Sequence, residues 1–133
     1  MNTAPLQKKI EYAIVCDDVR REDNGKFIII GAYGSDIRVS LTPANLRLSL
    51  LVAARSETEH QTLISVRVTQ DGKRIFELPE SLEFRMPAQE IALFSLGGIP
   101  VAVEIGKMLD FQVKFDRGRY RSACKLQVRE KTP

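Results

Sequence analysis

The chain lacks the residue types on which most small active sites and cofactor sites depend. Its 133 residues contain no tryptophan, one histidine and two cysteines. The one histidine, His60, lies in a polar connector, where a histidine-based nucleophile is not expected. One histidine and two widely separated cysteines do not give the paired ligands of structural zinc. No glycine-rich segment opens a helix to hold phosphate. We therefore expect a protein that is not an enzyme and that carries no cofactor.

Long apolar runs and a strong charge of one sign are also missing. No stretch approaches the ~20 apolar residues of a membrane span, and the first residues show no apolar signal core. Twenty Lys and Arg against seventeen Asp and Glu give a net charge of +3, milder than general nucleic-acid binders carry. Cys16 and Cys124 have apolar neighbours, as buried free thiols do. We expect a cytoplasmic protein with reduced thiols and no membrane partner.

What the sequence has is period-two alternation, most clearly over residues 109–131. Apolar side chains occupy one parity and charged ones the other, interrupted only at Arg117-Gly118. Side chains on a strand point alternately to opposite faces, so this segment predicts a hairpin that lies over a core. A tight turn at Arg117-Gly118 would set Lys125 opposite Asp110 and leave Tyr120 on the apolar side.

The rest of the chain favours short strands as well. Asn24-Gly25 and Asp71-Gly72 predict hairpin turns, and we expect a three-residue loop at the second so that Val68 faces Phe76. Residues 27–31 (FIIIG) form an unbroken apolar run, typical of a central strand buried on both faces. No window of eleven residues shows helical spacing. We predict one all-β domain over residues 1–133, an antiparallel sandwich of eight or nine strands, with short disordered ends near 1–8 and 130–133.

Three segments also carry a resemblance. They are EYAIVCDDVRREDNGKFIIIGAYGSDIRV (11–39), HQTLISVRVTQDGKRI (60–75) and IALFSLGGIPVAVEIGKMLDFQVKF (91–115). Together they resemble a bacterial family of small β-sandwich proteins that is known only as a domain of unknown function. The resemblance implies an immunoglobulin-like or C2-like sandwich, and it brings no catalytic residues.

An acidic group is the first candidate for binding. Asp17 and Asp18 follow an apolar strand, and Asp23 comes soon after. In C2-like sandwiches, loop aspartates collect calcium, which needs several oxygen ligands that converge on one point. Arg20 and Arg21 are interleaved here and offset the charge. We therefore expect a solvated hairpin and no metal site.

A basic face on the last strand is the second candidate. Its members are Arg117, Arg119, Arg121, Lys125 and Arg129, followed by Lys131. Ten residues of strand at ~3.3 Å each span about 33 Å, enough to follow an acidic protein surface. If the strand is an edge, the same charges discourage strand addition. Nucleic acid is not the expected ligand, because no aromatic side chain is interleaved for base stacking.

These observations predict a non-catalytic protein-interaction or structural module. We expect it to recognise a protein partner, an acidic one or a second copy, through an exposed strand edge or the basic sheet face. A sandwich that binds a small ligand or an anion is the alternative. An enzyme whose active site uses no histidine is the third possibility.

Overall fold

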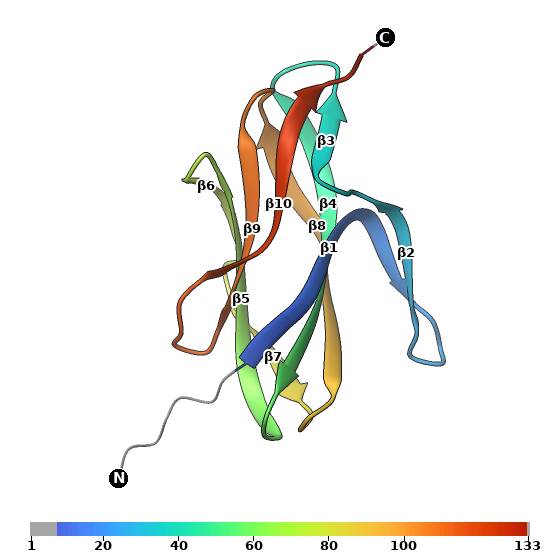
Figure 1. Ribbon diagram of the computed structural model, residues 1–133, viewed down its shortest axis with the longest axis vertical. Helices are drawn as coiled ribbons and strands as arrows, with labels where there is room; N and C mark the ends of the chain where they lie inside the picture. Colours follow the sequence, from blue (N-terminus) through green and yellow to red (C-terminus); the bar gives the residue numbers. More distant parts are fainter. Residues whose placement is uncertain (1–7, 133) are drawn as a thin grey trace.

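The computed structural model describes residues 8–132, and these form ten β-strands with no helix (Figure 1). The strands are β1 (Lys8–Arg21), β2 (Phe27–Ala32), β3 (Asp36–Val39), β4 (Ala44–Ser56), β5 (His60–Gln70), β6 (Lys73–Glu77), β7 (Leu82–Met86), β8 (Ile91–Val103), β9 (Met108–Phe115) and β10 (Arg121–Glu130). Of the ends that we expected to be disordered, residues 1–7 and 133 lie outside the described residues. Lys8 and Glu130 are strand residues.

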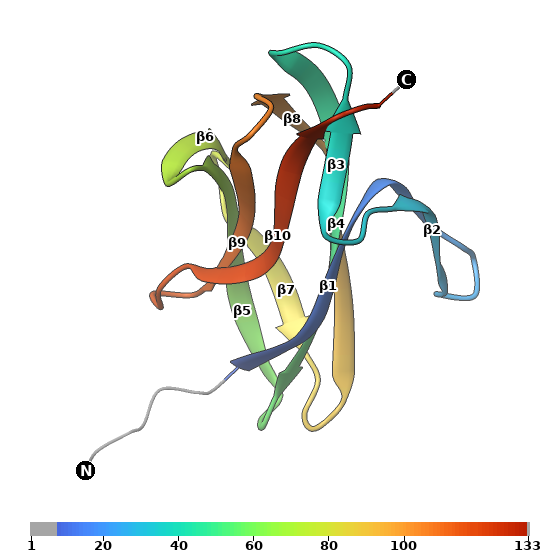
Figure 2. The same cartoon turned by 45° about the horizontal axis from the view of Figure 1, so that its top comes forward.

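The strands form two sheets that face each other, as the two views in Figures 1 and 2 show. The first sheet has the order β2-β1-β4-β8, and the second has the order β3-β10-β9-β5-β6, with β7 also paired to β5. The predicted all-β sandwich is confirmed, with ten strands rather than eight or nine. All strand pairs are antiparallel except β3 and β10, which run parallel.

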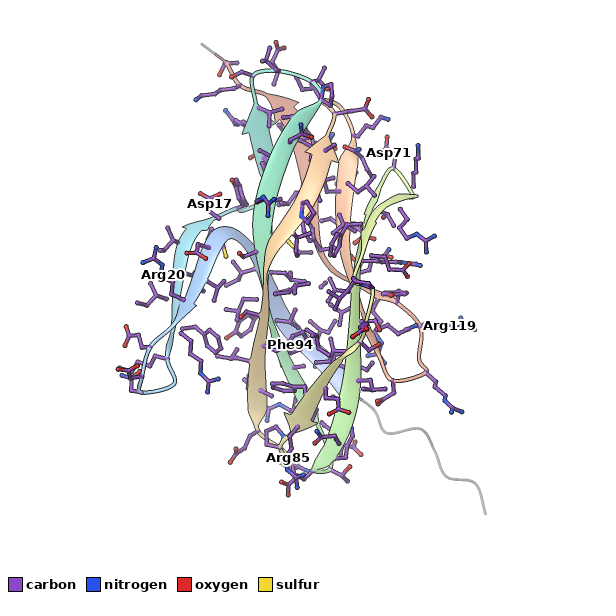
Figure 3. The ribbon with its side chains drawn as sticks, turned by 180° about the vertical axis from the view of Figure 1, so that it is seen from behind. Asp17, Arg20, Asp71, Arg85, Phe94 and Arg119 are labelled. Carbon is purple, nitrogen blue, oxygen red and sulfur yellow. The ribbon has the colours of Figure 1, made fainter. Side chains whose placement is uncertain are left out.

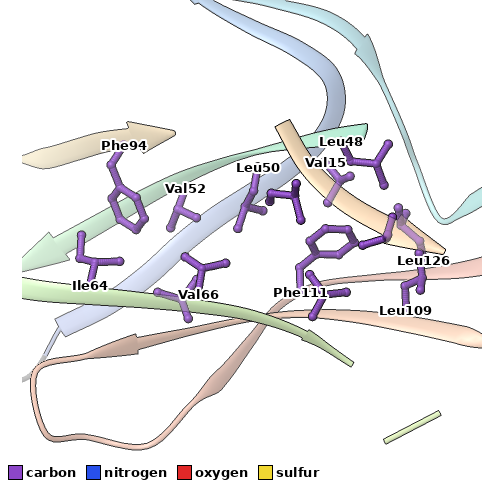
Figure 4. Close-up of a cluster of buried hydrophobic side chains, with 14 of the residues drawn as sticks. Val15, Leu48, Leu50, Val52, Ile64, Val66, Phe94, Leu109, Phe111 and Leu126 are labelled. Atoms are coloured by element: carbon purple, nitrogen blue, oxygen red, sulfur yellow. The ribbon is translucent and has the colours of Figure 1, made fainter. Parts of the chain in front are cut away.

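The core lies between the sheets and follows the period-two pattern (Figure 4). On the first sheet it is formed by Val15, Leu48, Leu50 and Val52, and on the second by Ile64, Val66, Leu109, Phe111 and Leu126, all at most 1% exposed. The parity that the alternation predicted for residues 109–115 is therefore the parity that is buried. Each such side chain contributes about 1.5–3 kcal/mol by leaving water.

The turn between β5 and β6 differs from its prediction. Gln70 pairs directly with Lys73, so the loop has two residues, Asp71 and Gly72, both with positive φ. The prediction of a three-residue loop was therefore wrong. A register shift between Val68 and Thr69 still places Val68 opposite Phe76, because the bulge supplies the extra residue that the loop lacks.

The position of β2 is the main departure from the sequence-based prediction. Residues 27–31 do not form a central strand that is buried on both faces. β2 is the last strand of its sheet, and its isoleucines are exposed. An unbroken apolar run is typical of burial in a sheet, but it does not determine whether neighbouring elements cover it.

Candidate functional site

The hairpin of β1 and β2 extends beyond the sheet that carries its base. β1 pairs with β4 only from Lys8 to Cys16, and its later residues, to Arg21, pair with β2 alone. The second half of β1 and all of β2 thus form a two-stranded ribbon, which projects from the side of the sandwich (Figures 1 and 2). We call this ribbon, residues 17–32, the hairpin arm.

The hairpin arm carries apolar side chains that are open to solvent. Ile28, Ile29 and Ile30 are 42%, 37% and 41% exposed, and because successive side chains alternate, both faces of β2 are accessible. Among the described strands β2 pairs only with β1, so one of its edges is also free. Edge strands are commonly protected by charges or proline. The six residues of β2, FIIIGA, contain neither.

The turn of the arm has the geometry that its sequence predicts. The amide of Gly25 donates to the carbonyl of Glu22 at 3.0 Å, and the amide of Glu22 donates to the carbonyl of Lys26 at 2.8 Å. Gly25 has φ +85°, a conformation that glycine adopts without a steric penalty. The side-chain oxygen of Asn24 accepts from the amide of Lys26 at 3.1 Å. These bonds fix the register of the two strands.

The base of the arm is held by a close contact between its strands. Gly31 has φ +68°, and a Cβ at this position would clash with the carboxylate of Asp17. The hydroxyl of Tyr33 donates to that carboxylate at 2.6 Å. Burial, with the adjacent Asp17, raises the pKa of Tyr33 to about 12. Only glycine fits this position without moving the carboxylate that anchors the arm.

Charge is distributed unevenly along the arm. Asp17 and Asp18 lie near the base, whereas Arg20 and Arg21 lie nearer the tip. The turn adds charges of both signs, Glu22, Asp23 and Lys26. Asp18 and Arg20 form an exposed ion pair at 3.1 Å, the kind of pair that contributes at most about 1 kcal/mol. The strand part of the arm is therefore acidic at one end and basic at the other.

The candidate metal residues lie within this arm. Asp17 accepts the Tyr33 hydroxyl, Asp18 pairs with Arg20, and Asp23 is exposed in the turn. Within residues 8–132 there is no group of three or more His, Cys, Asp or Glu side chains that could hold a metal ion. His60 is the first residue of β5, and its Nδ1 lies 2.8 Å from the carbonyl oxygen of Thr58.

The candidate basic residues do not form one stripe. Arg117 and Arg119 lie in the exposed loop between β9 and β10, and a register shift between Ser122 and Cys124 sets Arg121 opposite the core residue Val113. Arg121 is therefore out of phase with Lys125, which pairs with Asp110 as predicted. Arg129 lies further along β10 and forms an ion pair with Asp36 of β3 at 3.3 Å. Figure 3 shows Arg119 on the side of the molecule opposite to Arg20.

Tyr120 is another departure from the predicted register. Its ring lies 4.0 Å from the guanidinium carbon of Arg67 and 5.0 Å from the Lys114 nitrogen. The prediction that Tyr120 lies on the apolar side was wrong. It assumed a tight turn at Arg117-Gly118, whereas β9 ends at Phe115 and β10 begins only at Arg121. Tyr120 thus stacks with cations on the outer face of the second sheet.

A hydrogen-bond network covers the middle of the same outer face. Arg67 donates to the side-chain oxygen of Gln112 at 2.6 Å, and the Gln112 amide donates to Asp110 at 2.7 Å. Ser122 donates to the other oxygen of Asp110 at 2.5 Å. Arg67 and Lys114 on this face are thus already engaged with a neighbouring acceptor or ring.

Comparison with known protein families shows to which family the chain belongs. A family model, "Family of unknown function (DUF6941)", matches residues 11–121, which include the hairpin arm and strands β2 to β9. The chain belongs to this family. All three segments that carried the resemblance lie inside the residues matched to DUF6941, so the expected family of unknown function is confirmed. Among curated proteins, none matches the chain. No helix within residues 8–132 has the length and apolarity that a membrane span requires.

The exposed edge of β2 is the feature that sequence reasoning missed. A usable signal was present, because the turn at Asn24-Gly25 places the isoleucines opposite the polar segment DDVRR. A strand buried on both faces would not pair with Asp18 and Arg20 without charged partners for both. The register of the hairpin therefore carried the information that the apolar run alone did not.

Proposed function

We propose that this chain is a non-catalytic protein-interaction module that binds an extended segment of a protein partner along the free edge of β2. The observation that carries the proposal is the exposure of Ile28, Ile29 and Ile30 on a strand with one unpaired edge. Strand addition to such an edge combines main-chain hydrogen bonds with contacts to alternate side chains. Apolar side chains grouped on a protein surface are typical of interaction sites.

The edge of β2 is better suited to this function than the basic residues of the second sheet. Arg129 is paired with Asp36, and Arg67 is engaged by Gln112 and Tyr120. A partner at that face would have to replace these contacts, whereas the edge of β2 offers unpaired backbone groups. The arm also projects from the sandwich, and within residues 8–132 no other strand lies beside the free edge of β2 (Figure 1).

Site-specific photocrosslinking in the native cell tests the proposal. A benzophenone side chain replaces Ile29 in one version of the chain and Leu63 in the other. Leu63 is a matched control, because it is 45% exposed on β5, a strand that is paired on both sides. We expect a protein adduct of defined mass from position 29 and none from position 63. No adduct at position 29, or the same adducts at both positions, would refute the proposed function.

A further inference from the structure

We infer that the strand bound by β2 is the β2 strand of a second copy of this chain, paired antiparallel about a two-fold axis at Ile29. The inference rests on the proposed function and names its partner. It joins two four-stranded sheets, each ordered β2-β1-β4-β8, into one continuous sheet of eight strands.

The hydrogen-bond pattern of the arm shows which backbone groups of β2 are free. The Glu22 amide donates to the Lys26 carbonyl, which puts these two residues at a hydrogen-bonding position of the ladder. Such pairs alternate along an antiparallel ladder, so Ile28, opposite Arg20, directs its amide and carbonyl toward β1. Ile29 therefore directs both of its backbone groups toward the free edge. Two copies of Ile29 can exchange two hydrogen bonds across a two-fold axis.

The side chains of β2 are complementary to themselves in this register. With Ile29 on the axis, Ile28 of each copy lies opposite Ile30 of the other, and both point to the same face. This pairing gathers four isoleucine side chains on one face and two copies of Ile29 on the other. Each isoleucine is 37–42% exposed in the single chain, so the contact removes apolar surface that the sandwich itself leaves in water.

The charges of the arm favour the antiparallel arrangement of two identical chains. Arg20 pairs with Ile28 and Asp18 with Ile30 within one arm. In the two-fold register, a row of neighbouring residues across the four strands runs from Arg20 and Ile28 of one copy to Ile30 and Asp18 of the other. Each row thus has a positive charge at one end and a negative charge at the other. A parallel arrangement would instead place Arg20 in one row with Arg20 of the other copy and Asp18 in one row with Asp18, so the opposite charges at the ends of each row would be lost.

The shape of the molecule leaves room for the second copy. In Figure 1, β2 is the strand of the arm that lies farther from the rest of the sandwich, so its free edge faces away from the body. Figure 2 shows, after a 45° turn, that the arm as a whole projects from the side of the sandwich. The two sandwiches would then lie on opposite sides of the joined arms.

Sedimentation equilibrium of the purified chain over a wide concentration series tests the pairing. We expect the wild type to reach the mass of two chains, and Ile29→Lys to weaken the association about tenfold or more by placing two charges on the axis. Leu63→Lys, which changes an equally exposed aliphatic residue away from this edge, should associate like the wild type. Circular dichroism checks that each variant is folded. A wild type that stays monomeric, or an Ile29→Lys variant that associates as strongly, overturns the inference.

Crosslinking separates this inference from the proposed function and does not depend on a folded lysine variant. The purified chain with benzophenone at position 29 should give an adduct of two chains. A cellular adduct with a different protein, together with a monomeric purified chain, would overturn self-pairing and leave the proposed function intact. Absence of any adduct at position 29 would overturn both.

Discussion

The hairpin arm and the hairpin of β9 and β10 are both two-stranded, yet they differ in almost every contact. β9 lies between β10 and β5, and the end of β10 is covered by β3, so this second hairpin is embedded in a six-stranded sheet. The arm pairs only within itself beyond Cys16. Phe111 on β9 is fully buried, whereas Ile29 on β2 is open to solvent. The same type of element thus supports the core in one place and offers a surface in the other.

The largest expected contrast is between alanine substitutions in the two hairpins, one at a buried residue and one at an exposed residue. Phe111→Ala should lower the free energy of unfolding by about 3–5 kcal/mol, because it leaves a cavity in the centre of the sandwich. Ile29→Ala should cost less than about 1 kcal/mol at dilute protein, because its side chain is partly solvated already. Urea denaturation measures both. Equal losses would mean that β2 is packed against the sandwich and that the comparison between the hairpins fails.

The stability of the arm should depend on the glycine at position 31, at its base. Gly31→Ala is expected to lower the free energy of unfolding by about 1–3 kcal/mol, since φ +68° and the Asp17 carboxylate both oppose a Cβ. Gly34→Ala is the matched control, because a Cβ there meets no atom within 4 Å. Thermal melts of the two variants give the comparison. If Gly31→Ala is as stable as Gly34→Ala, the arm is not anchored at this contact.

The arm should also make the stability of the fold depend on alkaline pH. The pKa of Tyr33 is raised to about 12 from 10.0, chiefly by burial, so the folded state holds this proton while the unfolded state releases it. Its contribution is complete below pH 10 and is lost as the pH rises from about 10 to about 12. Urea midpoints across this window should fall less steeply in Tyr33→Phe than in the wild type. Tyr12→Phe, with its ring outside the arm, should behave like the wild type.

The smallest expected effect concerns the second hairpin. Arg129→Ala removes an exposed ion pair with Asp36, to which Arg38 also lies close at 3.5 Å. Such pairs contribute at most about 1 kcal/mol, and the remaining arginine retains part of the attraction. The melting temperature should therefore change little, and the change should disappear at high salt. A large loss of stability would show that β3 depends on this pair to stay joined to β10.

The fold class could be read from the sequence because alternation is a local property. Leu109, Phe111 and Val113 alternate with polar residues, and burial follows this parity in the structure. The same reasoning failed where position within the sheet matters. The sequence of residues 27–31 shows that β2 is apolar, but whether another of the described strands lies beside it depends on how the other nine are ordered.

The candidate site was only partly predictable, for a related reason. Lys125 lies opposite Asp110 as expected, but the register shift before Cys124 removes Arg121 from that face. A bulge adds one residue to one strand and exchanges the two faces beyond it. No residue at this point marks a bulge, so the basic stripe that the pattern indicated is broken in the folded chain.

The parallel contact of β3 with β10 has a consequence for how the chain acquires its structure. It joins residues 36–39 to residues 127–130, so an early strand has no lateral neighbour until the last one has been synthesised. Pairings between such distant segments form slowly, because a long loop must close first. During translation, the core-facing side chains of the earlier strands would stay exposed until β10 emerges, which makes this interval the one in which a chaperone would protect the chain most effectively.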